Sequence, residues 1–370
     1  MDKKFVMGIA AMAALTLVSC SSDDLDSFSD NSSKNEAISF DGYLGRSAVA
    51  VNGTRGSEET KETLKTKGFG VFGNYTDGQT SDPDFFKNQK VTCPDTKWTY
   101  SPLKYWPTQG KIDFLAYAPY KEGQALNANA TTFDFTVVDK AADQIDLLWA
   151  NATGQIKTNF EGTTKEKVKF LFKHALSRLG YTVKLSGNYS SDNATFTLRK
   201  ITLAGSPDGT KNAFYKKGTI DLSKKDATGL WNAATSDDNK QYFTWFDGSY
   251  IVKNSNPKHP TNSADEDYSK KDYLFVIPQD FSLTTEGADK LYVIVEYDVT
   301  YKSGTPSTTI TNTVYKKLPI KFEQGKAYML NLTIGLPIEF DIDVETVSGV
   351  KDWDEQTGTN IGSWDDISRK

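Results

Sequence analysis

The sequence predicts an all-β protein. Apolar residues recur at every second position in run after run, most clearly between positions 291 and 301. The runs are short and regularly spaced, and Gly, Pro, Asn or Asp bounds each of them, which is typical of a β-sandwich or a barrel. No segment beyond the first twenty residues keeps a 3.6-residue apolar stripe over three turns of helix. With 370 residues, the chain is long enough for two domains of ordinary size.

The first half of the chain is expected to begin with a half-buried strand. In the segment 38–44, Ile38, Phe40 and Leu44 alternate with Ser39, Asp41 and Tyr43. A polar stretch with Arg46 and Arg55 separates this strand from the next apolar run. The further strands expected before position 174 are Phe69–Tyr75, Trp98–Tyr105, Ile112–Tyr117, Thr132–Val138, Ile145–Trp149 and Val168–Phe172.

The alternation breaks at residues 174–179, and strands resume at Tyr181. We therefore expect a boundary there, between an N-terminal β-sandwich at 38–173 and a C-terminal one at 174–347. Residues 223–272 are rich in Asp, Asn, Lys and Ser, so we expect a long loop with one short strand at Tyr242–Phe246.

The last strand expected is one-sided. Its apolar positions alternate with four carboxylates, at Glu339, Asp341, Asp343 and Glu345. One face is therefore suited to burial and the other to solvent. The apolar positions are Ile338, Phe340, Ile342 and Val344. A polar tail, residues 348–370, follows.

The N-terminus has the parts of a secretory signal peptide. Lys3 and Lys4 precede an uncharged run at 6–18, and small residues lead to Cys20. The run is shorter than the roughly 20 residues of a membrane-spanning helix. Its end resembles a lipobox, which implies a signal peptide at 1–19 and lipidation of Cys20. The alternative is an ordinary signal peptide with a chance cysteine.

The residues after Cys20 are expected to form a tether. Residues 20–37 are mostly Ser, Asp and Asn, with almost nothing to bury. The acidic residues directly after Cys20 resemble a surface-export signal of lipoproteins, although a solvated linker has the same composition. If Cys20 carries lipid, only Cys93 remains, and no internal disulfide can form.

Charge and residue content argue against several functional classes. The net charge of -5 gives no general basic field for nucleic acid. The two histidines, His174 and His259, form no metal-binding pair or Ser/His/Asp arrangement with recognisable spacing. His174 is expected to be a packed residue at a strand end. The acidic run 265–267 lacks the calcium-loop pattern and is expected to be solvated. We expect no cofactor, no metal and no enzymatic activity, although the sequence alone leaves a pair of glycosidase carboxylates open.

Two further motifs have a structural interpretation. Residues 68–73 match the dinucleotide pattern G-x-G-x-x-G, but the turn composition of residues 74–78 follows where a helix is required. This segment is therefore expected to be a Gly-rich strand. The aromatic residues between Trp98 and Trp106 could stack on a sugar, but packing between two sheets is the favoured interpretation.

These segments together resemble the fimbrillin family, the type V pilins of Bacteroidales. The matching pieces are the leader, the early strand, TRG at 54–56, GFGVF at 68–72, KYWP at 104–107, DFLAYAP at 113–119, FKHALSRL at 172–179 and GKAYMLNL at 325–332. The resemblance implies two tandem transthyretin-like β-sandwich domains. It also implies assembly in which an Arg-specific protease removes the first strand and a neighbouring subunit's strand takes its place.

Applied to this chain, the resemblance assigns roles to several residues. The displaced strand is expected to contain Ile38, Phe40 and Leu44, after cleavage at Arg55 or, alternatively, at Arg46. The candidate donor strand is Ile338–Val344, for which a permanent place in its own domain is an equal alternative. The expected partners are other fimbrial subunits, the protease and the outer membrane through the lipid.

Two functional hypotheses follow. The first is a structural subunit of a fimbrium at the cell surface, exported as a lipoprotein and assembled by strand exchange. The second is a permanently anchored surface lipoprotein that binds glycans or acts as an adhesin, using aromatic residues such as Trp98 and Trp106.

Overall fold

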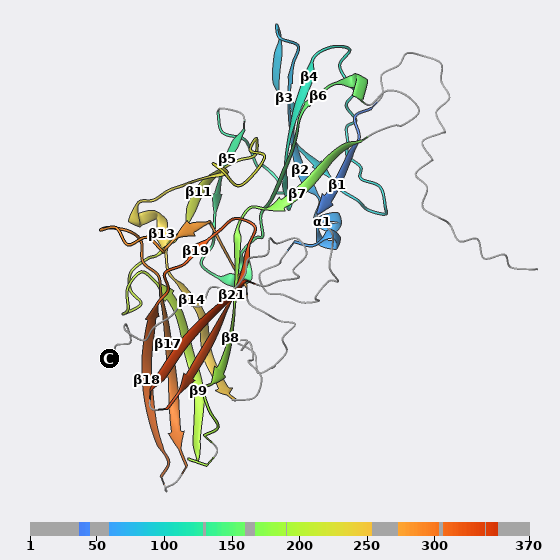
Figure 1. Cartoon of the computed structure of the whole chain (residues 1–370). Coiled ribbons are helices and arrows are strands. Elements are labelled where there is room, and N and C mark those ends of the chain that lie inside the picture. Colours follow the sequence, from blue (N-terminus) through green and yellow to red (C-terminus); the bar gives the residue numbers. More distant parts are fainter. Residues whose placement is uncertain are drawn as a thin grey trace, which may run out of the picture. The chain divides into compact units, whose positions relative to one another are not determined.

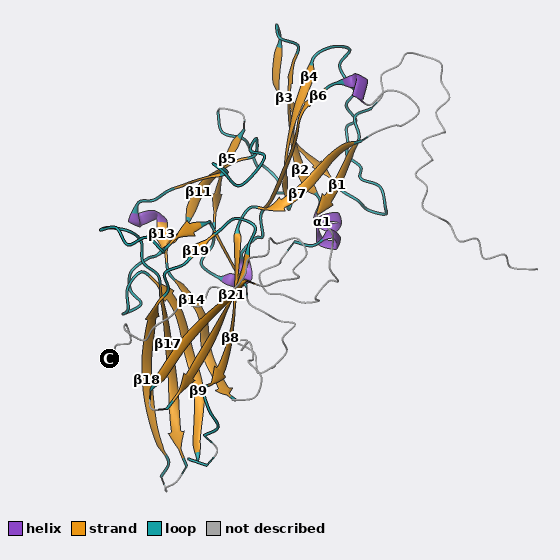
Figure 2. Cartoon of the chain, viewed as in Figure 1, coloured by secondary structure: helices purple, strands orange, loops and turns teal. Residues whose placement is uncertain are grey.

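The computed structural model describes residues 37–44, 59–128, 131–159, 167–189, 191–253, 273–302, 306–336 and 338–346. Strands dominate these residues, as the sequence predicts (Figures 1 and 2). The helical elements described are α1 (Lys61–Lys67) and three short 3-10 turns at Ala141–Asp143, Lys157–Asn159 and Asp237–Asn239. Within this part of the chain, no helix is long and apolar enough to cross a membrane.

A six-stranded sheet occupies the first half of the chain. Its strands lie in the order β1-β7-β6-β4-β2-β3. Their bounds are β1 Phe40–Leu44, β7 Val168–His174, β6 Leu148–Gln155, β4 Lys111–Ala118, β2 Phe69–Thr76 and β3 Ser81–Val91. β1 and β7 are parallel, and the other neighbours in the sheet are antiparallel. β1 and β3 are therefore the two edges of this sheet.

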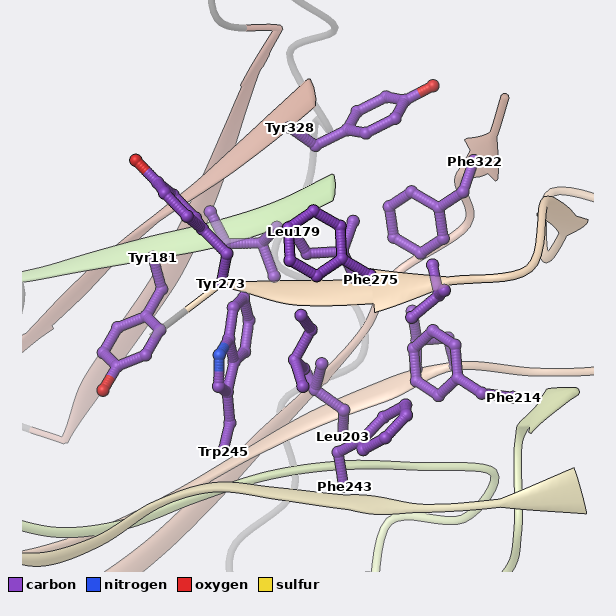
Figure 3. Close-up of a cluster of buried hydrophobic side chains, with 14 of the residues drawn as sticks. Leu179, Tyr181, Leu203, Phe214, Phe243, Trp245, Tyr273, Phe275, Phe322 and Tyr328 are labelled. Atoms are coloured by element: carbon purple, nitrogen blue, oxygen red, sulfur yellow. The ribbon is translucent and has the colours of Figure 1, made fainter. Parts of the chain in front are cut away.

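Two four-stranded sheets form most of the second half. One has the order β14-β9-β17-β18 and the other β15-β8-β20-β21. Their bounds are β14 Phe243–Val252, β9 Ala194–Ala204, β17 Tyr292–Tyr301, β18 Thr308–Lys317, β15 Leu274–Val276, β8 Ser177–Leu185, β20 Ala327–Gly335 and β21 Glu339–Thr346. Side chains of both sheets meet in one buried cluster, where the ring of Tyr181 packs edge-on against Trp245 (Figure 3).

Smaller sheets connect these parts. β5 (Thr132–Thr136), from the first half, pairs with β11 (Lys217–Asp221), which also pairs with β12 (Trp231–Ala233). Two-stranded pairs complete the fold, β10 (Phe214–Tyr215) with β13 (Lys240–Gln241) and β16 (Gln279–Asp280) with β19 (Lys321–Phe322).

The expected domain junction coincides with a change of sheet. The chain leaves the six-stranded sheet at His174 and enters β8 at Ser177, with Ala175 and Leu176 buried between them. The hydrophobic cluster of the second half also contains Phe72, Leu115 and Trp149 from the first half. The division into two domains at 173/174 stays a prediction.

The glycine-rich motif is a strand, as expected. Gly68 ends α1 with a φ of 74°, and residues 69–76 form β2 in the middle of the sheet. A side chain on Gly68 would lie 2.4 Å from the carbonyl oxygen of Val91, so the position requires glycine on two grounds. No helix follows the third glycine, and the nucleotide-binding interpretation is therefore excluded.

Several sequence predictions are wrong in detail. The strand expected at Ile145–Trp149 begins only at Leu148, and strands resume at Ser177 rather than at Tyr181. Trp98–Tyr105 is no regular strand: it contains two residues in isolated bridges, Thr99 and Tyr105, and Pro102 between them lacks an amide donor for a ladder. The expected loop at 223–272 is shorter, because β14 runs over ten residues rather than Tyr242–Phe246. Register shifts between Thr244 and Phe246, and between Asp247 and Tyr250, hide its two-residue period.

Candidate functional site: the edge strand β1

β1 has one strand partner. It pairs in parallel with β7, from Phe40 opposite Val168 to Leu44 opposite Phe172, and its other edge has no ladder partner among the described strands (Figure 1). The segment that precedes it is held by the segment Trp98–Tyr105: the Ile38 amide donates to the Lys104 carbonyl at 2.8 Å, and the Tyr100 hydroxyl donates to the Ile38 carbonyl at 2.7 Å. β1 is therefore an edge strand with few backbone attachments.

The apolar face of β1 is deeply buried all the same. Phe40 and Leu44 of β1, and Ile38 just before the strand, are at most 4% exposed, as the two-residue period predicted. The Phe40 ring packs at centroid distances of 5.3–5.7 Å against four aromatic rings, those of Phe86, Tyr100, Phe114 and Phe170. We call these four rings, together with Phe69 and Phe172, the β1 core. Removal of β1 would open this cluster to water.

Gly42 lets the β1 core close over the strand. A Cβ atom at this position would lie 2.9 Å from the Phe69 ring and 3.3 Å from the Trp98 indole. Trp98 packs on Phe69 at a centroid distance of 4.9 Å and is only partly buried. Any strand with a larger side chain at this position must therefore displace one of the two rings.

The chain re-enters the described structure at Glu59, directly after the segment that contains Arg46 and Arg55. These two arginines and Cys20 lie outside the described residues, as do the acidic run 265–267 and the tail 348–370. Neither the cleavage site nor the lipidation site is therefore tested, and both stay predictions.

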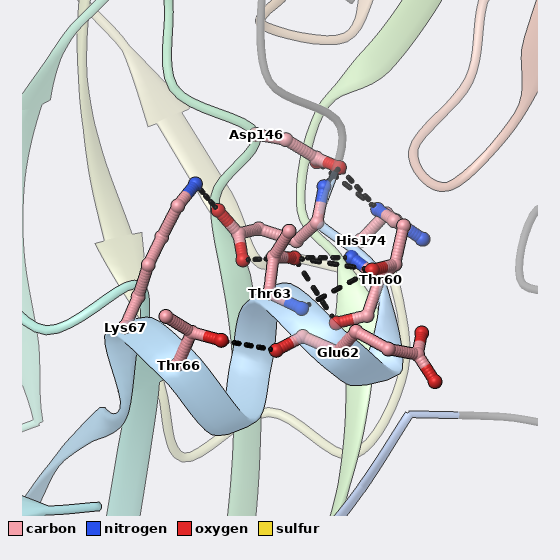
Figure 4. Close-up of polar contacts among 8 residues, drawn as sticks. Thr60, Glu62, Thr63, Thr66, Lys67, Asp146 and His174 are labelled. Atoms are coloured by element: carbon pink, nitrogen blue, oxygen red, sulfur yellow. Dashed lines mark hydrogen bonds and ion pairs between the residues drawn. The ribbon is translucent and has the colours of Figure 1, made fainter. Parts of the chain in front are cut away.

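A largely buried polar cluster holds the chain at Glu59. Figure 4 labels four of its members, Thr63, Lys67, Asp146 and His174. The Glu59 amide donates to the Asp146 carboxylate at 2.9 Å, and His174 Nδ1 lies 2.9 Å from the same carboxylate. The Glu59 carboxylate accepts a hydrogen bond from the Thr63 hydroxyl at 2.9 Å and pairs with Lys67. We call Glu59, Thr63, Lys67, Asp146 and His174 the Glu59 cluster. It ties the start of α1 to β6 and to the end of β7.

His174 is a packed residue at a strand end, as predicted, with 1% of its surface exposed. Its partners could not be predicted from the sequence, because Asp146 lies 28 residues before His174 and Glu59 lies 87 residues before Asp146. The capping box formed by Thr60 and Thr63 at the start of α1 is the only local signal that could have marked this place.

Burial raises the pKa of the Glu59 carboxyl, and the neighbouring Lys67 offsets only part of this effect. Between the pKa of the unfolded state and the raised pKa of the folded state, the folded protein keeps a proton that the unfolded chain has lost. The unfolding free energy therefore falls as the pH rises through the range between these two pKa values. We expect the unfolding free energy of the native chain, relative to Glu59→Gln, to increase as the pH falls from 7 towards about 4.5. Urea unfolding of both proteins across this range measures it. A difference that stays constant with pH would contradict the assignment.

The candidate donor segment belongs to its own sheet in this chain. β21 pairs antiparallel with β20 at the edge of the sheet. Phe340, Ile342 and Val344 are buried, and Ile338, just before the strand, is partly buried. Burial acts to raise the pKa of the Asp341 carboxyl, but the Lys316 ammonium at 2.6 Å outweighs it and lowers the pKa overall. The donor role stays a prediction.

Comparison with known proteins decides the family. A sequence model described as "Fimbrillin-like" matches residues 54–353. The chain belongs to the fimbrillin-like family. It is 27% identical over 384 aligned residues to the fimbrium subunit Fim1C of Phocaeicola vulgatus, covering 95% of this chain and 97% of that one. The fold is similar to the crystal structure of a fimbrial protein from Bacteroides vulgatus, with a TM-score of 0.60 and 22% identity over 84% of this chain and 99% of the other.

In this fimbrillin-like chain, the aromatic segment 98–106 is a packing element. Trp106 is 4% exposed, and its ring packs edge-on against Phe114. Trp98 covers Phe69, as described above. Interior packing therefore holds for Trp106, whereas Trp98 is partly buried and Tyr105 is 49% exposed.

Proposed function

We propose that this chain is a subunit of a cell-surface fimbrium that polymerises by exchange of β1. One observation carries the proposal: β1 has a single strand partner, yet its residues Phe40 and Leu44, and Ile38 just before it, are buried apolar side chains. A strand of this kind can leave without unravelling the sheet, and its departure leaves an apolar groove with unpaired backbone groups along β7. An extended segment with alternate apolar side chains satisfies both requirements at once.

The segment 338–344 fits these requirements by its pattern. In a register that places Phe340 where Phe40 lies, Ile342 takes the place of Gly42. The Phe69 and Trp98 rings then move aside, because they already approach the Cβ position of Gly42. The fluorescence of Trp98 is therefore expected to report the exchange, and a Trp98→Phe variant isolates its contribution.

The steps before exchange follow the resemblance. Residues 1–19 direct export, Cys20 receives lipid, and the chain reaches the outer membrane. An Arg-specific protease then cuts at Arg55, or at Arg46, between β1 and the Glu59 cluster. Because the Glu59 cluster fixes the chain on the far side of either cut, the body of the subunit keeps its fold when β1 departs. The name of the relative from P. vulgatus, a fimbrium subunit, supports the assignment.

The alternative is a permanently anchored glycan-binding or adhesin lipoprotein. Of the two residues suggested for it, Trp106 is 4% exposed, whereas Trp98 packs on Phe69 and stays partly exposed.

Treatment of the purified full chain with an Arg-specific protease tests the proposal. We expect one cut between Leu44 and Glu59, loss of the N-terminal fragment, and then oligomers visible by size-exclusion chromatography and electron microscopy. Arg55→Ala should abolish both cut and assembly, whereas Arg46→Ala should leave them intact; the reverse result would assign the cut to Arg46. A cleaved chain that stays monomeric at all concentrations would refute the polymerising role.

A further inference from the structure

The two faces of β7 differ in chemistry. Val168, Phe170 and Phe172 face the interior and are buried, whereas Lys169, Leu171 and Lys173 face outward and are exposed. The same holds for β1, whose outward residues are Asp41 and Tyr43. The register places Asp41 beside Lys169 and Tyr43 beside Leu171. Any strand paired with β7 therefore presents one face to the β1 core and the other face to these lysines.

The outward face of β7 borders a basic pocket of about 300 Å³. Its lining residues include four lysines, Lys169, Lys173, Lys224 and Lys225, and we call it the lysine pocket. The loop after β11 supplies two of them, and Asn151 of β6 fixes this loop by donating hydrogen bonds to the carbonyl groups of Leu222 and Lys224, at 2.8 and 2.7 Å. The site is therefore assembled from three separate segments.

Among the described residues, one of these four lysines pairs with a carboxylate. Lys224 pairs with Asp221 at 3.4 Å, but Lys169, Lys173 and Lys225 form no ion pair with any carboxylate that the structure describes. The Lys173 ammonium donates to the Lys225 carbonyl and lies over the Trp149 ring, at 5.6 Å from its centroid. β1 brings a single carboxylate, Asp41, to this region.

The candidate donor strand has the complementary pattern. Every outward position of β21, from Glu339 to Glu345, carries a carboxylate. Asp341 pairs with Lys316 in its own chain, whereas Asp343 and Glu345 are exposed. Placed beside β7 with its apolar face on the β1 core, this strand would bring four carboxylates to a face where β1 has one.

We propose that the lysine pocket and the outward face of β7 select the incoming strand by charge, and that the strand is β21 of a second copy of this chain. The inference rests on the proposed strand exchange and adds its specificity. Opposite charges on facing strands stabilise the pairing, and like charges disfavour it. The same complementarity accelerates the encounter and rejects strands with a basic outer face.

The test uses two synthetic peptides and the protease-treated full chain. The first peptide is the native sequence 338–346, and the second carries E339Q, D341N, D343N and E345Q, which keep size and apolar pattern. We expect the native peptide to bind at least about tenfold more tightly at about 0.01 M salt. The difference should shrink at about 1 M salt, where charges are screened beyond about 3 Å. Fluorescence anisotropy of labelled peptides measures both affinities.

Matched variants locate the selecting charges. The double variant Lys169→Glu with Lys173→Glu should remove the preference for the native peptide. The double variant Lys111→Glu with Lys121→Glu makes the same change of net charge at two exposed lysines outside the lysine pocket and should keep the preference. Because all four lysines are exposed, the variants should retain the native melting temperature, and Lys169→Gln with Lys173→Gln provides a milder change if the reversal unfolds the chain.

Each outcome bears on the inference. Equal binding of the two peptides to a chain that does polymerise would overturn selection by charge and leave strand exchange standing. Polymerisation without binding of either peptide would exclude β21 as the occupant. If the cleaved chain neither polymerises nor binds a peptide, the proposed function fails, and the inference fails with it.

Discussion

Phe40→Ala is expected to lower the unfolding free energy of the uncut chain by about 3–5 kcal/mol. The ring is 1% exposed and touches four other rings, so its removal leaves a cavity lined by rigid aromatic side chains. Urea unfolding measures the difference. Tyr43→Ala is the matched control, because Tyr43 lies on the same strand with 44% of its surface exposed, and its removal should cost less than about 1 kcal/mol.

The same variant distinguishes a retained strand from a released one. If β1 leaves after cleavage, the cleaved Phe40→Ala and native proteins contain the same body and should unfold at the same urea concentration. A difference that persists after cleavage and purification would show that β1 stays in place, which contradicts the proposed exchange.

Asp146→Ala is expected to lower the unfolding free energy by about 2–6 kcal/mol, because two buried polar groups lose the carboxylate that they contact, at about 1–3 kcal/mol each. The Glu59 amide and His174 Nδ1 both lose their contact with this carboxylate. Asp143→Ala, at an exposed position three residues earlier, should change the stability by less than about 0.5 kcal/mol. Equal effects of the two substitutions in urea unfolding would show that the Glu59 cluster contributes nothing to stability.

Sequence periodicity predicted those strands in which the residues of one face are all apolar or aromatic. β1, β7, β17 and β21 all follow from apolar residues at alternate positions. β18 could not be predicted in this way, because it is an edge strand with mostly polar residues, of which the first four are exposed. β3 could not be predicted either. It begins with the sequence Ser-Asp-Pro-Asp, and its register with β2 shifts twice, so its apolar residues do not alternate with a period of two.

The candidate site also contains residues that the sequence could assign and residues that it could not. Ile38, Phe40 and Leu44 could be assigned to a buried strand from the sequence, because burial of one face leaves a local pattern. The Glu59 cluster and the lysine pocket could not, because each combines segments that only the fold brings together. Lys169 and Lys173 look like ordinary solvated residues until Lys224 and Lys225 are placed beside them.

The link of Ala175 and Leu176 has a mechanical consequence. β7, which would hold the incoming strand, continues through these two residues into β8, and β8 pairs with β20 from Arg178 opposite Ala327 to Leu185 opposite Ile334. β20 leads in turn to the candidate donor, β21. In a fibre joined by such strands, a pulling force would pass through each subunit along this route. The β8–β20 ladder would be loaded in shear, with many hydrogen bonds resisting together, while the loops and smaller sheets carry little tension.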